Sequence, residues 1–398
     1  MTTTVIDNVT LVTPDELVPQ RAVRVREGTI QEVGPCGGVA GERVLDGNGM
    51  YLAPGFIDLH IHGLLRWGID NGRADLAAIC GSLPQYGVTG FLPTISPRVP
   101  GEDSAFLTDL ARVKPDGAAI LGFHLEGPFL TQTGALPPEA LGRADPQRVR
   151  SLIEAANPYP AIFSIAPEFE GVEDLIPIMR EHAPVFMSHT RAGVKDAGKA
   201  IEAGARHATH FYDVWPPPPE SDPGVRPCGA VEAVLADPRV TVDFILDGEH
   251  VDPVAIELAL RCKGEEGVCL ITDANVGAGL PPGRYTGIGK RDVVFAYRGG
   301  PARIADGSDQ EGTLAGSGLT LDLAVKNATE MLDLDVCAAV VMASTNPAAV
   351  LGLEARKGRI ERGCDADMVL LDSDLNVRRT WVGGECVYDG GKSARHGG

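Results

Sequence analysis

Residues 55–70 read GFIDLHIHGLLRWGID, and this stretch places two histidines one residue apart at the end of an apolar run. Residues i and i+2 of a β-strand face the same side, so His60 and His62 can turn together toward one cation and bind it through neutral imidazole nitrogens. Such a pair is weak evidence when taken alone, and a structural role for it stays open at this point. The bulkier residues 64–67 that follow have no evident use in a metal site.

The length and charge of the chain limit its class. A chain of 398 residues suits one large barrel with an accessory domain. Its formal net charge of −19 argues against nucleic-acid and anionic-membrane partners, because both need a face rich in lysine and arginine. The start lacks a basic region before a long apolar core, and no apolar run approaches the roughly 20 residues of a membrane span. We therefore expect a cytoplasmic enzyme.

Both ends of the chain alternate apolar and polar residues in short pieces, which is typical of β-hairpins. Residues 21–34, RAVRVREGTIQEVG, show the pattern near the N-terminus, with Glu27 and Gly28 as the predicted turn. Residues 358–372 and 377–391 repeat it near the C-terminus. Neither end is large enough to stand alone, so we predict that the two combine into one small β-sandwich.

The middle of the chain changes to short apolar strands followed by helix-compatible stretches. The eight candidate strands are residues 52–60, 90–95, 119–126, 161–166, 184–189, 206–210, 240–245 and 267–273. Eight such units predict an α/β fold, a (β/α)8 TIM barrel beside the small β-sandwich formed from both termini. The expected domain boundaries are 1–52 with 354–398 for the sandwich, and 53–353 for a metal-dependent hydrolase barrel.

Six side chains that can bind metal fall at or just past the carboxyl ends of these strands. The active sites of TIM barrels are built on that rim. The predicted metal ligands are His60, His62, Glu126, His189, His210 and Asp273. Chance would scatter such residues between both ends of the barrel, so their common placement predicts one metal site.

The two carboxylates have different expected roles. Glu126 follows an apolar strand in GFHLEGPFL, and a buried carboxylate needs a cation or hydrogen-bond donors. Asp273 ends the last strand in GVCLITDAN, where it can contact both the metal and the attacking water as a general base, so it is the first predicted catalytic residue. The alternatives are a turn cap for Glu126 and a helix N-cap for Asp273.

Three further histidines have separate expectations. His250 lies past the seventh strand and is the second predicted catalytic residue, because its imidazole can donate to a substrate carbonyl as negative charge develops there. The alternative is an exposed loop histidine. His124 is expected to support the metal ligands rather than to join them, and His207 to face away from the site in a structural role.

Taken together, the motifs of this chain resemble the amidohydrolase superfamily and, within it, the N-acetylglucosamine-6-phosphate deacetylase family. The resemblance runs from end to end, through APGFIDLHIHG, GVTGFLPT, GFHLEGPFL, IAPE, AIEAGARHATHFYD, DGEHVDP, ITDANVGAGLPPGRY, GTLAGSGLTLD, TNPAAVLGL and GRIERGCDADMVLLD. It implies a TIM barrel beside a β-sandwich, a homodimer, and a divalent metal. That metal is usually zinc and sometimes iron or another ion, with one or two ions bound.

The resemblance also implies roles for the residues named above. The core metal site would consist of Glu126, His189 and His210, and a second ion, in members that keep it, would add His60 and His62. The implied reaction is amide hydrolysis in a small N-acylated substrate. Asp273 takes a proton as water attacks, His250 stabilises the oxyanion, and Asp273 then protonates the departing amine, so that acetate and a free amine leave.

Three positions depart from the family pattern where the family recognises a sugar phosphate. Leu136 replaces a histidine, Ser221 and Asp222 replace Arg-Glu, and Tyr212, Asp213 and Val214 stand where the family has Asn-Ala. Phosphate recognition needs cations or several donors. We therefore hypothesise that the substrate is an N-acyl amine, such as an amino sugar, that lacks the 6-phosphate.

The alternative is that Arg66, Arg191 or Arg226 restores the phosphate contact. The positions expected to contact the substrate are Arg66, Trp67, Leu136, Tyr212, Asp213, Ala315, Gly316 and Ser317.

Two other functions stay open. One is another amidase of the superfamily, such as an N-acyl amino acid deacylase. Many of those sites use a carboxylated lysine on the fourth strand, and AIFSIAPE offers none. The other is a non-catalytic barrel, which should have lost its catalytic groups, whereas Asp273 and His250 are both present.

Overall fold

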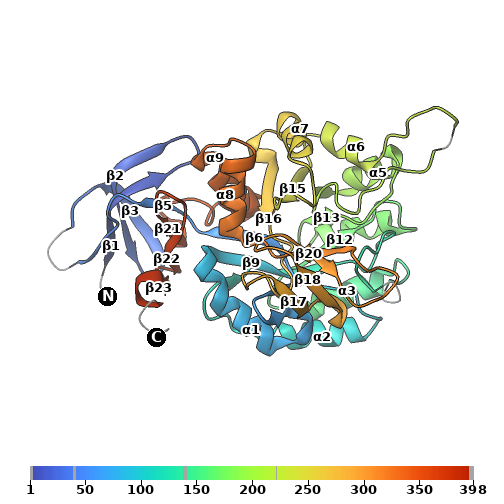
Figure 1. Cartoon of the computed structure of the whole chain (residues 1–398), viewed down its shortest axis with the longest axis horizontal. Coiled ribbons are helices and arrows are strands. Elements are labelled where there is room, and N and C mark those ends of the chain that lie inside the picture. The colour runs from blue at the N-terminus through green and yellow to red at the C-terminus, as the bar shows by residue number, and fades with distance from the viewer. Residues whose placement is uncertain (1–2, 39–41, 138–140, 221, 394–398) are drawn as a thin grey trace.

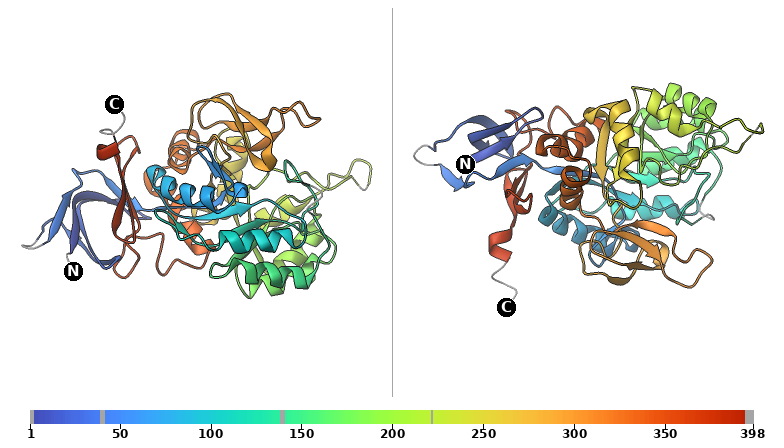
Figure 2. Two further views of the ribbon diagram at one scale, coloured as in Figure 1. Left: turned by 90° about the horizontal axis from the view of Figure 1, so that it is seen from below. Right: turned by 45° about the horizontal axis from the view of Figure 1, so that its top comes forward.

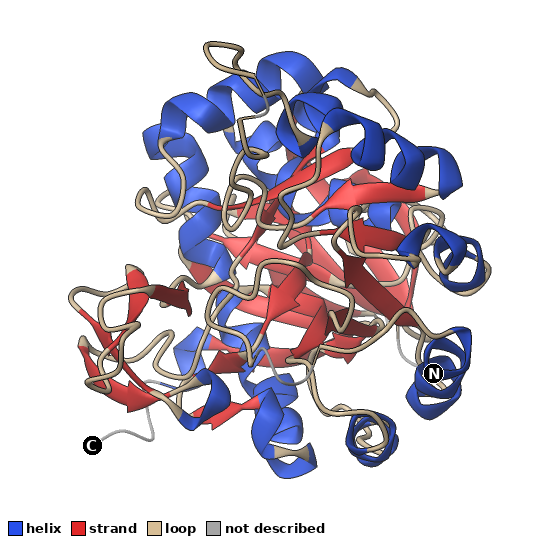
Figure 3. Cartoon of the chain, turned by 90° about the vertical axis from the view of Figure 1, so that its right-hand side faces the viewer, coloured by secondary structure: helices blue, strands red, loops and turns tan. Residues whose placement is uncertain are grey.

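A computed structural model of the chain describes residues 3–38, 42–137, 141–220 and 222–393. Its larger part is a nearly closed barrel of eight parallel strands, shown in red inside a ring of blue helices in Figure 3. The barrel strands are β6 (Phe56–Ile61), β9 (Val88–Ile95), β11 (Phe123–Glu126), β12 (Ala161–Ile165), β13 (Val185–Met187), β14 (Ala205–Ala208), β15 (Thr241–Ile245) and β16 (Val268–Ile271). The last strand returns to the first, where Asp273 N donates to His60 O at 2.9 Å. The predicted TIM barrel is thus confirmed.

The first predicted strand is wrong in one detail. Residues 52–60 are not one strand, because β5 (Tyr51–Pro54) belongs to the other sheet and β6 begins after Gly55. A Cβ at Gly55 would lie 2.2 Å from the side chain of Thr89, so this glycine lets the chain pass closely from one sheet to the other. The third predicted strand likewise divides into a short β10 (Ala119–Ile120) and β11.

Helices follow the barrel strands and cover the outside of the barrel (Figure 3). They are α1 (Arg73–Ser82), α2 (Glu102–Leu110), α3 (Pro146–Ala156), α4 (Ile176–Arg180), α5 (Val194–Ala203), α6 (Ala230–Ala236), α7 (Pro253–Lys263) and α8 (Leu321–Met331). Helix α7 shows why they start where they do, since the carboxylate of Asp252 accepts a hydrogen bond from Val254 N and Pro253 fills the first position. Helix α5 buries Ala197, Ala200 and Ile201, the i, i+3, i+4 spacing of an amphipathic helix.

The chain ends form a smaller β-domain at one side of the barrel, with both termini on it (Figures 1 and 2). Its strands are β1 (Thr4–Val12), β2 (Leu17–Arg26), β3 (Thr29–Pro35), β4 (Arg43–Asp46), β5, β21 (Met368–Leu371), β22 (Val377–Val382) and β23 (Glu385–Asp389). The first half of β1 pairs with β4 and its second half with β5, so the sheet divides into two layers. Val23, Met368 and Trp381 fill the core between them. The β-sandwich from both termini is as predicted, and so is the turn at Glu27 and Gly28.

The division of the chain into 1–52 with 354–398 and 53–353 stays a proposal, because the barrel core extends into the sandwich, which also has a core of its own. Val369 and Leu371 of β21 belong to the same buried cluster as the barrel strands. Between the parts lie α9 (Val336–Val340), a π-helical turn (Val341–Thr345) and α10 (Asn346–Val350), and the chain's last helix is α11 (Gly390–Ser393). In the described residues we find no helix both long and apolar enough to span a membrane.

A four-stranded antiparallel sheet between β16 and α8 is absent from the predictions. It consists of β17 (Gly283–Thr286), β18 (Asp292–Phe295), β19 (Pro301–Ile304) and β20 (Leu314–Ser317). Val293, Phe295 and Ile304 give it a small core of its own. Its last residue, Ser317, pairs with Ala274 just past β16, so this sheet starts from the barrel rim.

A short hairpin follows the two histidines of the first barrel strand. Strand β7 (Gly63–Leu64) pairs with β8 (Trp67–Gly68), and Leu65 at its tip exchanges backbone hydrogen bonds with Ala278 and Gly277 at 2.9 and 2.7 Å. Leu64 is buried, and Trp67 packs against the barrel core. This hairpin therefore joins the first loop to the segment after the last strand.

Candidate active site

The structure brings the six predicted metal-binding side chains to one point at the carboxyl end of the barrel. The carboxylate of Glu126 is at the centre, with its Oε1 2.9 Å from His189 Nε2 and 3.1 Å from His210 Nε2, and its Oε2 3.1 Å from His62 Nε2. His60 Nε2 lies 3.1 Å from His62 Nε2. Asp273 Oδ1 lies 3.5 Å from each of these two nitrogens.

Three of these residues share an uncommon backbone conformation. His189, His210 and Asp273 have φ angles of 49°, 33° and 45°, all in the left-handed region. Each follows the end of a strand, and the positive φ turns its side chain over the barrel mouth. Such residues cost about 1–3 kcal/mol each and gather at functional sites. The strain supports a functional reason for their placement.

The charges of the cluster are set by burial and by Glu126. Burial would raise the pKa of Glu126, but the surrounding histidines hold it well below its usual value. Burial works against protonation of His62 and His210, yet hydrogen bonds to Glu126 raise their pKa values to about 9 and about 10. Burial dominates at His60, whose pKa is lowered, and at Asp273, whose pKa is raised to about 7.

The donor set fits a divalent metal ion. Three imidazole or carboxylate atoms lie within 4.8 Å of one another in two overlapping groups, one of His60, His62 and Asp273 and one of His60, Glu126 and His210. Asp273 Oδ1 is buried and has no hydrogen-bond partner. Buried nitrogen and carboxylate donors that converge without protein partners are typical of sites for such ions.

His250 is buried beside this cluster, so its reading as an exposed loop histidine is wrong. Its side chain is fully buried, and its Nδ1 lies 2.7 Å from Asp247 Oδ2. Its Nε2 is buried without a partner. Burial disfavours the charged imidazole, but Asp247 raises the His250 pKa above its usual value. An Nε2–H held in this way can donate to a developing oxyanion.

The other readings of the two carboxylates are also wrong. The oxygens of Glu126 contact histidines rather than a following turn. No helix begins after Asp273 before the short one at Ile288–Lys290 in the described chain, so Asp273 is not an N-cap.

A cavity of about 200 Å³ opens onto the cluster. Its lining residues are His62, Glu126, Gly134, Ala135, Leu136, His189, His210, Asp213, Val214, Asp273, Ile288, Thr313 and Leu314. No lysine or arginine is among these described lining residues. Asp213 lines the cavity without an ion pair to another described residue, and its charge adds to the raised pKa values of His210 and His250.

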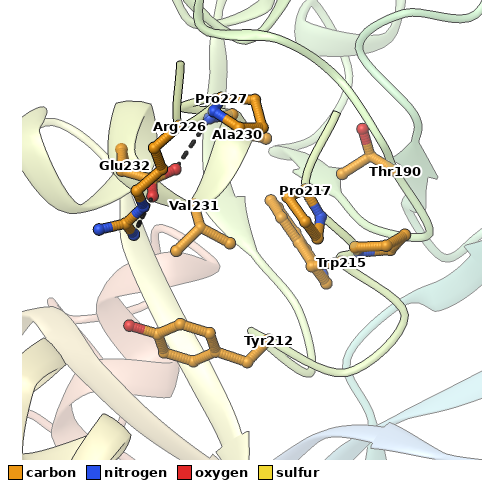
Figure 4. A pocket seen from close by; sticks show the side chains of 11 residues that line it. Thr190, Tyr212, Trp215, Pro217, Arg226, Pro227, Ala230, Val231 and Glu232 are labelled. Atoms are coloured by element: carbon orange, nitrogen blue, oxygen red, sulfur yellow. Dashed lines mark hydrogen bonds and ion pairs between the residues drawn. The ribbon is translucent and has the colours of Figure 1, made fainter. Parts of the chain in front are cut away.

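The segment 212–215 contributes residues to this cavity and to a second one of about 330 Å³. Asp213 and Val214 face the first, whereas Tyr212 and Trp215 face the second (Figure 4). Tyr212 and Val214 in this segment both have positive φ angles, of 78° and 55°. The predicted substrate contact of Tyr212 therefore lies behind the catalytic cavity, and that of Asp213 lies within it.

The arginines proposed as phosphate contacts lie elsewhere. Arg226 is at the second cavity, exposed, and paired with Glu232 at 3.1 Å (Figure 4). Arg66 and Arg191 are exposed, and neither lines the catalytic cavity. Ser221 lies outside the described residues, and Asp222 is exposed.

The remaining predicted substrate contacts divide into two groups. Leu136 lines the catalytic cavity. Trp67 lies in the hairpin described above. Gly316 and Ser317 lie against Asp273, where a Cβ at Gly316 would approach Asp273 O to 2.6 Å, and Ala315 O accepts from Asn275 Nδ2 at 2.7 Å. Their neighbours Thr313 and Leu314 reach the cavity instead. Contact of any of these residues with a substrate stays a prediction.

His124 and His207 both lie buried in the barrel interior. His124 bonds to Leu59 O at 3.1 Å and to Ser164 Oγ at 2.5 Å, below the metal-binding cluster, which agrees with a supporting role. His207 bonds to Asp243 Oδ2 at 2.8 Å. It does not turn away from the barrel interior, and its structural role stays a prediction.

Sequence reasoning missed two aspartates near the site. Asp247 orients His250, and its position three residues earlier in DGEH was an available signal. Asp243 interrupts the apolar strand TVDFI, and a charged residue at such a position needs an explanation.

Comparison with known proteins identifies the family of the chain. A model of the amidohydrolase family matches residues 51–387. An N-acetylglucosamine-6-phosphate deacetylase from Danio rerio is 34% identical over 371 residues, which cover 88% of this chain and 87% of that protein. An N-acetylgalactosamine-6-phosphate deacetylase from Escherichia coli O157:H7 is 32% identical over 383 residues, or 94% and 97% of the two chains.

Solved structures agree over nearly the full length. The N-acetylglucosamine-6-phosphate deacetylase from Pasteurella multocida superposes with a TM-score of 0.85 at 27% identity, covering 96% of this chain and 99% of its own. A mutant of the Mycobacterium smegmatis enzyme, in complex with N-acetyl-D-glucosamine-6-phosphate, gives 0.85 at 30% identity, with 97% and 99% covered.

Proposed function

Because this chain belongs to the amidohydrolase family, we propose that it is a metal-dependent deacetylase that hydrolyses the amide of an N-acetylated amino sugar. The observation that carries the proposal is a pair of buried groups, of which Asp273 lines the cavity and His250 is close enough for the charge of Asp273 to raise its pKa. Asp273 presents an unpartnered carboxylate oxygen, and His250 presents an unpartnered Nε2. One can accept a proton and the other can donate a hydrogen bond, as amide hydrolysis requires.

The metal would be held by His60, His62, Glu126, His189, His210 and Asp273 in one or two sites, and we propose zinc as the ion. A divalent ion bound there supplies a Lewis acid for the acyl carbonyl and lowers the pKa of water. Asp273 removes a proton from the attacking water and then returns it to the amine that leaves. His250 donates from Nε2 to the oxyanion, and Asp247 keeps this imidazole oriented.

We further propose that the substrate lacks the 6-phosphate named for the relatives. A phosphate carries negative charge and is bound by arginine, lysine or several N–H donors. The described lining of the catalytic cavity offers neither of those cations, and it contains Asp213 and the apolar Leu136. A carboxylate at this place repels phosphate and accepts hydrogen bonds from sugar hydroxyls.

The test is acetate release by the zinc-loaded protein from N-acetylglucosamine and from its 6-phosphate, with the galactosamine pair as a second comparison. We expect kcat/KM to favour the unphosphorylated sugars. A strong preference for the phosphate esters would refute the substrate proposal but leave the deacetylase proposal standing. No acetate from any N-acetyl sugar, with activity on N-acyl amino acids, would instead identify the other amidase class.

We also propose a homodimer in the cytoplasm, as the family resemblance implies. Sedimentation velocity of the purified protein tests the first point, since a monomer and a dimer of a 41.9 kDa chain separate clearly. Fractionation of cells that make the protein tests the second.

A further inference from the structure

A buried aspartate below the metal-binding cluster holds part of that cluster in place. Asp243 is fully buried in β15, and its carboxylate accepts three hydrogen bonds. The donors are the backbone N–H of His210 at 2.5 Å, the hydroxyl of Thr209 at 2.9 Å, and Nε2 of His207 at 2.8 Å. Removing a carboxylate from water costs several kcal/mol, and this cost is offset only when its oxygens are fully satisfied.

The network is anchored on its outer side. His207 must carry its proton on Nε2 to donate to Asp243, so its Nδ1 is an acceptor. That nitrogen lies 2.7 Å from the hydroxyl of Thr241, which can donate to it. His207 is also fully buried, with its ring against Phe186 at 4.5 Å between centroids. Asp243 is therefore fixed by donors that themselves have little freedom to move.

Through Thr209 the network reaches a predicted metal ligand. The hydroxyl of Thr209 has one proton, and the nearby carboxylate of Asp243 is its acceptor. Its oxygen is then left to accept from His60 Nδ1, 3.2 Å away. This places the proton of His60 on Nδ1 and leaves the lone pair of Nε2 directed at Glu126, His62 and Asp273.

A second arm reaches His210 through the backbone. The left-handed φ of 33° at His210 is unfavourable for a residue with a side chain. The hydrogen bond from His210 N to Asp243 Oδ1 holds this conformation, and His210 Nε2 is thereby directed at Glu126.

We propose that Thr209 and Asp243 are positioning residues that present two histidines to a divalent cation. Thr209 fixes the tautomer of His60, and Asp243 fixes the backbone turn at His210. The inference rests on the metal site of the proposed function. Neither residue lines the catalytic cavity, so neither is expected to contact the substrate. Groups that orient metal-ligating histidines change metal affinity by roughly 10- to 100-fold when they are removed.

The test compares zinc affinity among Thr209→Val, Thr209→Ser and Thr380→Val, by competition with a chromophoric chelator. Valine keeps the shape of threonine but cannot accept from His60, so we expect Thr209→Val to weaken zinc binding by roughly 10- to 100-fold. Thr209→Ser keeps the hydroxyl and should stay within about threefold of the wild type. Thr380 is the matched control, because it is buried in the sandwich and donates to Pro84 O at 2.7 Å, far from the site.

The outcomes separate this inference from the proposed function. Both metal-free valine variants are expected to melt at a lower temperature than the wild type. If only Thr209→Val also binds zinc more weakly, the result supports positioning. Equal zinc affinity for Thr209→Val and the wild type overturns it. If the wild type binds no divalent ion, the result refutes the proposed metal-dependent function, and the positioning inference that rests on it is refuted with it. The absorption spectrum of the Co²⁺-loaded proteins is a second readout, which should change in Thr209→Val and in Asp243→Asn but not in Thr380→Val.

Discussion

At the scale of single residues, Asp273 combines burial, strain and an unsatisfied oxygen. Its left-handed φ of 45° and its pKa of about 7, raised by burial, are unfavourable for an ordinary aspartate. Groups with such shifts in a cavity are typical of catalytic acids and bases. The structure thus gives the residue the properties that its proposed dual role requires.

We expect Asp273→Asn to lower kcat by roughly 10²- to 10⁴-fold, because the amide can neither accept the proton of water nor return it to the amine. Acetate release at saturating substrate measures the effect. Zinc content determined on the same preparation is the control, since it separates lost proton transfer from a lost ligand. Activity within about tenfold of the wild type, at full zinc content, would exclude Asp273 as the base.

We expect Asp213 to set the preference of the site for unphosphorylated over phosphorylated sugars. In Asp213→Asn the carboxylate that faces the cavity becomes neutral, so repulsion of a phosphate is removed. We expect the kcat/KM ratio of phosphorylated to unphosphorylated sugar to rise by roughly tenfold, corresponding to about 1.4 kcal/mol. Glu232→Gln, at the second cavity, is the control and should leave the ratio unchanged.

Metal binding should depend on pH through His62 and His210. Their pKa values of about 9 and about 10 leave both protonated at pH 7 in the metal-free protein. Each must lose its proton to bind a cation, so affinity should rise with pH until these values are passed, by up to about tenfold per pH unit for each proton. Calorimetric titration with zinc in phosphate and in Tris measures the number of protons released on binding. Identical heats, once corrected for zinc binding by the buffers, would contradict it.

At the scale of elements, strand ends and one hairpin build the site. The hairpin of β7 and β8 packs on the segment after β16, and Gly63 makes the approach possible. A Cβ there would lie 2.7 Å from Val276 N and 2.8 Å from Trp67 O, both backbone atoms that cannot move away cheaply. The bulky residues 64–67 thus have a packing role that links the first and last parts of the barrel.

We expect Gly63→Ala to destabilise the protein by about 2 kcal/mol, as overpacking does. Unfolding by urea, followed by circular dichroism, measures this. Gly198→Ala in α5 is the control, because open space surrounds that position and alanine favours helix by about 1 kcal/mol. A Gly63→Ala protein as stable as the wild type would show that the hairpin can shift.

At the scale of the whole molecule, the barrel core extends into the sandwich, although the sandwich also has a core of its own. β21 pairs with β5 in the sandwich, while Val369 and Leu371 pack with the barrel cluster. Thr380 of β22 donates to Pro84 O on the barrel side. Apolar surface common to two parts couples their stabilities.

We therefore expect the metal-free protein to unfold in one cooperative transition. The chain has three tryptophans, with Trp381 in the sandwich core and both Trp67 and Trp215 in or against the barrel core. The double variant Trp67→Phe/Trp215→Phe keeps only Trp381 and Trp67→Phe/Trp381→Phe keeps only Trp215, so their fluorescence, followed against temperature, reports each part separately. The two midpoints should coincide. A Trp381 signal that changes several degrees earlier would show that the sandwich unfolds alone.

The fold was predictable because its strands are buried on both faces and read as apolar runs. β17 to β20 escaped prediction, since strands of four residues with exposed positions resemble loops. The cluster was predictable because five strands each end in a metal-capable side chain. Asp243 was not singled out, because its donors His207 and His210 come from another strand and only the fold brings them to it. Asp247 bonds to its sequence neighbours Glu249 and His250, so its role could have been predicted from the spacing in DGEH.

By itself, the sequence determined the barrel, the sandwich from both termini, and the set of six metal-capable residues, because hydrophobic period and strand-end position are local properties. Only the tertiary structure decided that Arg226 pairs with Glu232 away from the catalytic cavity, that Tyr212 faces a second cavity while Asp213 faces the first, and that residues 64–67 pack as a hairpin. Those outcomes depend on contacts between segments distant in the chain, and no local pattern encodes them.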